Sequence, residues 1–278
     1  MSRLAPHRQR GFGLIAALVL VFLYAPIAVL VFFSFNAGRL FHRFDGFSLA
    51  WYGRAFANDG FHDAALNTLI VAVSAAFLAT LLATGAALGL QAMANRGRRE
   101  RASLILDVPL VLPEVVMAIA TLIFFSFAKT WIGFDLGLGN LVLAHTAFCL
   151  PFALMPIRAS LAGLDSGLAV AAADLYAGRW QTLRRVTLPL LLPGIGSGAA
   201  LAFIVSFDDF AMSQFVAGPG QTTLPVFIWA QLKRPLTPEV NAMCALMLAV
   251  SVLFICLSVA IVGRRQASSQ NIPQENTP

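Results

Sequence analysis

Long apolar runs separated by short polar segments dominate this chain. Six of these runs are long enough to span a bilayer, since about 20 apolar residues cross its hydrocarbon core as a helix. The predicted spans are 12–35, 64–90, 104–128, 139–157, 190–212 and 242–262. The pattern predicts an all-α, polytopic membrane protein. We expect a single transmembrane domain over 1–265 and a polar, disordered tail over 266–278.

Composition supports the same class. The chain is 59% apolar and 12% charged, whereas soluble domains average about 25% charged residues. The first run follows a basic segment, as in a signal peptide. It is longer than the 7 to 15 apolar residues of such a peptide, so we expect an uncleaved first span.

Basic residues predict the orientation. No lysine or arginine falls within the predicted spans, and most lie in the tails and loops of one side: Arg3, Arg8, Arg10, Arg96, Arg98, Arg99, Arg101, Arg158, Arg179, Arg184, Arg185, Arg264 and Arg265. The positive-inside rule then predicts that both termini are cytoplasmic. No basic cluster is interleaved with aromatic residues, so we expect no nucleic-acid partner. The aromatic-rich outer loop 36–63 fits either an interfacial belt or a docking site for an external partner.

The longest inner loop, 158–189, carries a helical pattern. Leu168, Ala171, Ala172 and Leu175 recur at the spacing of one helix face, and Ser166 could cap its start. Gly178 can end this helix, and Pro189 precedes the next span. The pattern fits a helix–turn–helix that projects from the membrane, or an amphipathic helix that lies on lipid headgroups.

The loop also resembles a known motif. Its Ala171-Ala172 pair and the later Val186-x-Leu188-Pro189 resemble the cytoplasmic EAA loop of bacterial ABC-importer permeases. The resemblance implies that the loop couples to an ATPase subunit through Ala171, Ala172, Asp174, Leu175, Tyr176, Gly178, Arg184, Arg185, Leu188 and Pro189. The glutamate and glycine of the family motif fall on Val170 and Tyr176, and we expect Gly178 to take over the turn.

Further blocks extend the resemblance along the chain. FLYAPIAVLVFFSFN at 22–36, PLVLPEVV at 109–116, AHTAFCLPF at 144–152 and GPGQTTLP at 218–225 resemble permeases of putrescine and spermidine importers. The resemblance implies a type I ABC-importer permease in the bacterial inner membrane. Implied partners are a second homologous permease, two ATPase subunits that hold ATP and magnesium, and a periplasmic polyamine-binding protein. Neither lysine follows a P-loop, so we expect a transport subunit that is not itself an enzyme and binds no cofactor.

Carboxylates within the predicted spans are candidate functional residues. Each costs about 2.5 to 3.5 kcal/mol at a helix centre, and no basic residue in the spans offsets them. Glu114 follows Pro109 and Pro113, which disrupt helical hydrogen bonds, and at 1.5 Å per residue it is predicted about 15 Å deep in its span. Broken helices at that depth commonly line a cavity. Asp107 lies nearer the span end, where we expect solvation.

The segment SFDDF contains two more candidates, Asp208 and Asp209. Adjacent helix residues point about 100° apart, so one of them is expected to face the translocation pathway. The other could hold helices together through Ser206 or Ser213. Aromatic faces suit the ammonium groups and alkyl stems of polyamines; the candidates are Phe207, Phe210 and Trp229, with added surface from Phe124 and Phe125.

Other residues favour packing over chemistry. His145 is interpreted as a hydrogen-bonded bundle histidine, and Cys149, Cys244 and Cys256 lack metal-ligand spacing. Gly194, Gly196 and Gly198 predict close helix packing, within the bundle or with a partner permease. Three other functions remain open: an ABC permease for a different solute, a proton-coupled secondary transporter that uses Glu114 or Asp208, or a non-transporting membrane scaffold whose inner loop docks a soluble partner.

Overall fold

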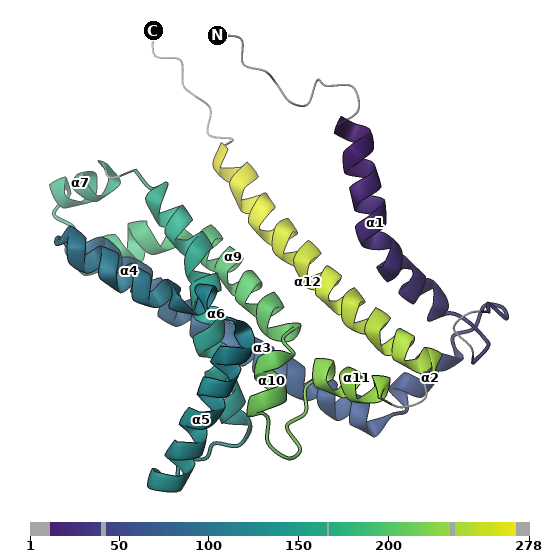
Figure 1. Cartoon of the computed structure of the whole chain (residues 1–278). Coiled ribbons are helices and arrows are strands. Elements are labelled where there is room, and N and C mark those ends of the chain that lie inside the picture. Colours follow the sequence, from purple (N-terminus) through teal and green to yellow (C-terminus); the bar gives the residue numbers. More distant parts are fainter. Residues whose placement is uncertain (1–11, 40–42, 166, 234–236, 271–278) are drawn as a thin grey trace. The chain divides into compact units, whose positions relative to one another are not determined.

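The protein is all-helical in the part of the chain that the structure describes. This computed structural model describes residues 12–39, 43–165, 167–233 and 237–270 (Figure 1). Within these ranges it contains no strand beyond one isolated bridge between Asn36 and Phe47. Six helical segments are long and apolar enough to span a membrane: Gly13–Phe33, Asp59–Ala92, Glu114–Ile132, Leu138–Ala162, Arg179–Phe207 and Pro238–Cys256. The predicted fold class and number of spans are confirmed.

The α-helices and their bounds are as follows: α1 Phe12–Phe33, α2 Ala50–Phe56, α3 Asp59–Ala92, α4 Arg96–Val111, α5 Glu114–Ile132, α6 Leu138–Ala162, α7 Gly167–Asp174, α8 Arg179–Thr182, α9 Leu188–Phe207, α10 Ala211–Val216, α11 Leu224–Leu232 and α12 Pro238–Gln270. A π-helical turn, η2, covers Leu183–Thr187 between α8 and α9. Helix α12 continues past residue 265, where the polar tail was predicted to begin. Residues 271–278 of that tail, and the capping candidate Ser166, lie outside the described residues.

The chain forms two compact units, and the expectation of a single transmembrane domain stays a prediction. One comprises Met1–Phe61 and Ile228–Ala249, and the other comprises His62–Phe227 and Val250–Pro278. Because α3, α11 and α12 each contribute residues to both units, hydropathy along one helix gives no sign of the division.

The segment after α1 is folded in the first unit. Trp51 Nε1 donates a hydrogen bond to the Asn36 carbonyl oxygen at 2.8 Å, and the rings of Phe35 and Phe47 stack with centroids 5.3 Å apart. Trp51 is buried, whereas Phe47 is exposed. The aromatic residues therefore divide between a local core and an exposed surface, and whether that surface contacts lipid or a partner stays a prediction.

Close packing of α6 against α9 organises the second unit. A Cβ atom on Gly198 would lie 2.6 Å from the Ala153 carbonyl oxygen, and one on Gly194 would lie 2.4 Å from Ser160 Cβ. Nothing lies within 4 Å of the corresponding position at Gly196. The predicted glycine-mediated packing thus occurs within the bundle at two of the three glycines.

The predicted span 104–128 is two helices. Helix α4 ends at Val111, Leu112 is extended, and Pro113 precedes the first residue of α5. Proline disfavours helical geometry in the residue before it and lacks an N–H donor. The disruption expected from Pro113 is present. However, the 15 Å depth assigned to Glu114 assumed a continuous helix and does not hold.

The predicted span 190–212 is broken as well. Helix α9 ends at Phe207, and α10 begins at Ala211. Asp208, Asp209 and Phe210 form the break. The two acids are therefore at a helix junction, where side chains can bond to free backbone N–H groups.

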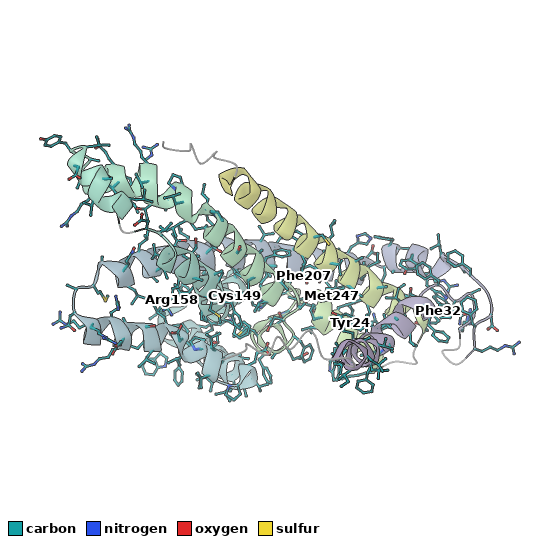
Figure 2. All side chains as sticks on the ribbon, turned by 90° about the horizontal axis from the view of Figure 1, so that it is seen from above. Tyr24, Phe32, Cys149, Arg158, Phe207 and Met247 are labelled. Carbon is teal, nitrogen blue, oxygen red and sulfur yellow. The ribbon has the colours of Figure 1, made fainter. Side chains whose placement is uncertain are left out.

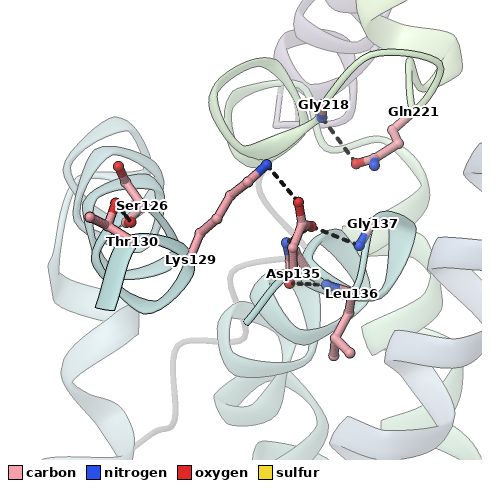
Figure 3. Close-up of polar contacts among 9 residues, drawn as sticks. Ser126, Lys129, Thr130, Asp135, Leu136, Gly137, Gly218 and Gln221 are labelled. Carbon is pink, nitrogen blue, oxygen red and sulfur yellow. Dashed lines mark hydrogen bonds and ion pairs between the residues drawn. The ribbon is translucent and has the colours of Figure 1, made fainter. Parts of the chain in front are cut away.

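Lys129 and Arg158 lie within the membrane-spanning helices α5 and α6, contrary to the sequence prediction, because both helices extend beyond their predicted ends. Arg158 is on α6 (Figure 2), and Lys129 is in the last turn of α5. Each pairs with an acid: Arg158 Nη1 lies 3.0 Å from Asp107, and Lys129 Nζ lies 2.7 Å from Asp135 (Figure 3). Asp107 is therefore ion-paired, where solvation was expected.

The Lys129–Asp135 pair predicts a small loss of stability in acid. The hydrogen bond from the Lys129 ammonium lowers the pKa of Asp135, with smaller contributions from the Gly137 N–H and Asn140. A lowered folded pKa means that the contribution to stability is present above the unfolded value of about 3.9 and is lost as pH falls below it. Between pH 6 and pH 3, Asp135→Asn and Lys129→Gln should each show a smaller fall in melting temperature than the unmodified protein. An unchanged fall in both variants would contradict this.

Candidate functional site

Asp209 is a fully buried acid that organises the helix junction. Its side chain has no exposed surface. Its carboxylate oxygens accept hydrogen bonds from the backbone N–H groups of Met212, at 3.3 Å, and Ser213, at 2.9 Å. These are N–H groups of the first turn of α10, which have no partner within the helix. Asp209 thus holds α10 in place.

His145 of α6 links this junction to the core of the bundle. Its Nδ1 atom hydrogen-bonds with Ser206 Oγ at 2.8 Å, and its Nε2 atom hydrogen-bonds with Ser213 Oγ at 3.1 Å. Nε2 also lies 3.4 Å from Asp209 Oδ2, and the His145 side chain is buried. The interpretation of His145 as a hydrogen-bonded bundle residue fits this geometry. Ser206 and Ser213 do take part in holding the helices, but through the histidine ring.

Asp208 has different surroundings from its neighbour. It is exposed, and its Oδ1 atom accepts a hydrogen bond from Ser251 Oγ of α12 at 3.2 Å. The two adjacent acids therefore point to different environments, although they lie in a break between helices and not on the continuous helix that the prediction assumed. Asp208 has the accessible carboxylate, and Asp209 has the structural one.

Glu114 approaches the helix junction from α5. It is the exposed first residue of α5, and α5 packs against α10. The carboxyl groups of Glu114 and Asp209 are near enough to interact electrostatically. The fold thus places Glu114, Asp209 and His145 together. The sequence named both acids as candidates but gave no signal that they meet or that His145 lies with them.

The aromatic candidates separate into buried and exposed residues. Phe207 is buried and stacks on Phe203, with ring centroids 5.6 Å apart, so it packs in the core and presents no open face, contrary to the sequence prediction. Phe210 is half-buried, and Trp229 is half-exposed on α11. Phe124 and Phe125 line an apolar cavity of about 550 Å³ between α5 and α6.

The loop 158–189 contains the predicted helices, α7 and α8. Of the apolar face predicted over Leu168, Ala171, Ala172 and Leu175, only Ala172 is buried. Several large side chains of this loop are exposed instead: Leu168, Val170, Leu175, Tyr176 and Trp180. Asp174, Gly178, Arg184, Arg185 and Pro189 are also exposed, and Leu188 is half-buried.

Tyr176 ends α7 in a conformation that usually requires glycine. Its φ is +57°, the left-handed region that disfavours residues with a Cβ atom. The Ala177 N–H donates to the Ala172 carbonyl at 3.0 Å, and the Tyr176 N–H donates to the Ala173 carbonyl at 2.9 Å. This is the bond pattern of a Schellman C-terminal cap. The expectation that Gly178 takes over the turn is wrong, because its φ is −67°.

A comparison with known families covers most of the bundle and this loop. Residues 79–269 match the family described as binding-protein-dependent transport system inner membrane component. The chain belongs to this family. Membership and the apolar spans together define a multi-pass inner-membrane protein.

Individual relatives in this family align along nearly the whole chain. The spermidine/putrescine transport system permease protein PotC of Haemophilus influenzae is 38% identical over 246 residues, covering 88% of this chain and 94% of the relative. The putrescine transport system permease protein PotI of Escherichia coli strain K12 is 35% identical over 265 residues, covering 95% and 92%. The resemblance to polyamine-importer permeases is confirmed.

Solved structures agree on the fold. A bacterial ABC transporter involved in the import of the acidic polysaccharide alginate matches with a TM-score of 0.72 at 19% identity. The match covers 95% of this chain and 99% of that one. At this identity the likeness supports the permease fold alone.

Proposed function

We propose that this chain is a permease subunit of an ATP-driven importer that moves putrescine or spermidine across the bacterial inner membrane. The observation that carries this proposal is the 35–38% identity to polyamine permeases along nearly their full length. In the proposed complex, the chain pairs with a homologous permease, two ATPase subunits and a periplasmic binding protein. Both termini and the loop 158–189 are cytoplasmic.

The acids at the helix junction support a cationic substrate. Lys129 and Arg158 are engaged with Asp135 and Asp107. Neither Glu114 nor Asp208 has a lysine or arginine partner among the ion pairs of the described ranges. An exposed carboxylate at membrane depth is stabilised by a passing ammonium group. We therefore assign Glu114 and Asp208 to the pathway and Asp209 to the support of both.

The exposed loop supports coupling to a separate ATPase. Leu175 is 82% exposed and Tyr176 is 97% exposed, at the end of a helix whose cap fixes their position. Large apolar side chains that are this exposed favour a protein interface. We propose that α7 and the following turn dock on an ATPase subunit, with Arg184 and Arg185 at the rim.

Reconstitution of the full complex tests the proposal. The chain should be purified with its partner permease, the ATPase subunits and the binding protein, and reconstituted into liposomes with ATP inside. Uptake of labelled putrescine should require ATP and binding protein and should be competed by spermidine. Uptake by the purified chain alone under a proton gradient would instead support a secondary transporter. Absence of polyamine uptake, with ATP-dependent uptake of another solute, would identify a different ABC permease.

Charge reversal at the rim of the docking surface should weaken coupling. In Arg184→Glu/Arg185→Glu, loss of about 1.4 kcal/mol of docking free energy corresponds to a factor of about ten in ATPase affinity. Pull-down of the ATPase and putrescine uptake should both fall, with the amount of permease in the membrane unchanged. Arg43→Glu, an exposed reversal in the outer segment, is the control and should leave both unchanged. Unimpaired assembly and uptake in the double variant would exclude the rim assignment.

A further inference from the structure

Arg158 has hydrogen-bonding capacity that the described residues do not use. Its Nη1 atom donates to both carboxylate oxygens of Asp107, each at 3.0 Å, and Ser103 Oγ donates to Asp107 Oδ2 at 3.2 Å. The Nε and Nη2 atoms of Arg158 are buried and have no hydrogen-bond partner in the described part of the chain. Buried donors are nearly always paired with an acceptor, so an acceptor is missing here.

A cavity of about 430 Å³ lies beside Arg158. It is bounded by the end of α3, the first half of α4 and the end of α6. Its polar lining consists of Gln91, Arg99, Glu100, Ser103 and Arg158. The two acids near it are already paired, Glu100 with Arg96 Nε at 2.9 Å and Asp107 with Arg158. The charge that remains available is that of Arg99, supported by exposed Arg98 and Arg101 on the same helix.

Helix α4 has the character of a helix at a lipid boundary. Its first half contains Arg96, Arg98, Arg99 and Arg101, and no residue of the helix is buried. Its second half exposes large apolar side chains: Leu104, Ile105, Val108 and Val111. A basic segment that leads into an exposed apolar face attracts anionic headgroups and then contacts acyl chains. The cavity opens at the basic half, beside the point where the apolar surface begins.

We propose that this cavity binds the phosphate group of an anionic phospholipid. Arg99 and a turned Arg158 side chain donate hydrogen bonds to the phosphate oxygens, while Arg158 and Ser103 each keep a bond to Asp107. The acyl chains lie along the exposed apolar residues of α4. The placement in the cytoplasmic leaflet rests on the orientation in the proposed function, but the phosphate chemistry does not.

The site links α4 to the end of α6, and α6 is followed directly by the loop that contains α7. A phospholipid that binds the folded protein and not the unfolded chain raises stability by mass action. Bound lipid should therefore stabilise the end of the bundle that is nearest to the proposed ATPase contact.

Native mass spectrometry and thermal unfolding of the delipidated full-length protein in detergent test the proposal. Added dioleoylphosphatidylglycerol should be retained and should raise the melting temperature, whereas dioleoylphosphatidylcholine with the same chains should not. Arg158→Lys keeps a cation for Asp107 but removes the unpaired guanidinium donors. It should lower phosphatidylglycerol affinity about tenfold, as should Arg99→Gln/Ser103→Ala. Arg98→Gln removes a neighbouring charge that does not line the cavity and should change affinity less than twofold.

Three outcomes would overturn the proposal. Equal retention of the two lipids would exclude recognition of an anionic headgroup. An effect of Arg98→Gln as large as that of Arg99→Gln/Ser103→Ala would indicate diffuse attraction to the basic helix. A rise in melting temperature with inorganic phosphate alone would indicate a site for soluble anions. Because these measurements use no polyamine, ATP or ATPase subunit, their result is separate from that of the uptake experiment.

Discussion

Replacing Gly198 by valine is expected to destabilise the second unit by about 3 kcal/mol, the upper end of the usual range for overpacking a core. The added Cβ atom would lie 2.6 Å from the backbone carbonyl oxygen of Ala153 on α6. A backbone oxygen cannot rotate away, so α6 and α9 would have to separate. Because this contact joins the two helices that contain His145 and Ser206, separation would also disturb the helix junction. Thermal unfolding of the purified subunit in detergent should show the loss.

Gly196→Val is the matched control. It makes the same chemical change two residues away on the same helix, where nothing lies within 4 Å of the new Cβ atom. Exposed substitutions away from special features usually change stability by no more than about 0.5 kcal/mol. Equal melting temperatures for the two variants would mean that α6 and α9 do not pack through Gly198 as the structure shows.

Asp208→Asn is expected to weaken transport, whereas Asp209→Asn is expected to lower stability. Asp208 is exposed, and neutralising it removes a charge-assisted contact worth about 1.5 to 3 kcal/mol to an ammonium group, or roughly 10- to 100-fold in transport affinity. Its effect on folding should be small. Asp209 is buried and accepts two backbone hydrogen bonds. Asparagine retains one acceptor oxygen, so we expect a stability loss of about 1 to 3 kcal/mol.

The two measurements to compare are putrescine uptake over a range of concentrations and the melting temperature of each variant. Asp208→Asn should raise the concentration for half-maximal uptake with little change in melting temperature. Asp209→Asn should lower the melting temperature and the amount of folded protein. If Asp208→Asn instead left uptake unchanged at every concentration, the assignment of Asp208 to the pathway would fail. Glu114→Gln provides an independent test, because Glu114 reaches the cluster from α5.

Hydropathy was sufficient for the spans because the cost of exposing polar backbone to lipid fixes both their length and their helical structure. It could not place the helix breaks at Leu112–Pro113 and at Asp208–Phe210. The prolines indicated the first break. The second has no breaker residue, and it is stabilised by the bonds from Met212 and Ser213 to the Asp209 carboxylate. These hydrogen bonds can form only after the chain has turned between α9 and α10.

The loop that contains α7 was likewise predictable from the sequence only in part. Periodicity over Leu168–Leu175 predicted the helix that became α7, because the spacing of apolar residues is a local property. Nothing in the sequence indicated that Tyr176 would end this helix, because glycine is the residue that favours the left-handed region. Tyr176 occupies that conformation because two backbone hydrogen bonds close the cap around it.

By itself, the sequence determined that this is a helical inner-membrane protein with six spans, a helical loop of the ABC-permease type and a small set of costly acids. The spans, the helical loop and the acids follow from local composition or spacing, whereas the inner membrane and the ABC-permease type follow from the resemblance of the sequence blocks to a known family. Only the tertiary structure decided that Asp209 is buried beside His145 and Glu114 and that Asp208 is exposed. It also decided that Arg158 pairs with Asp107. The partners of a charged side chain come from distant segments, and those contacts depend on how α5, α6, α9 and α10 pack.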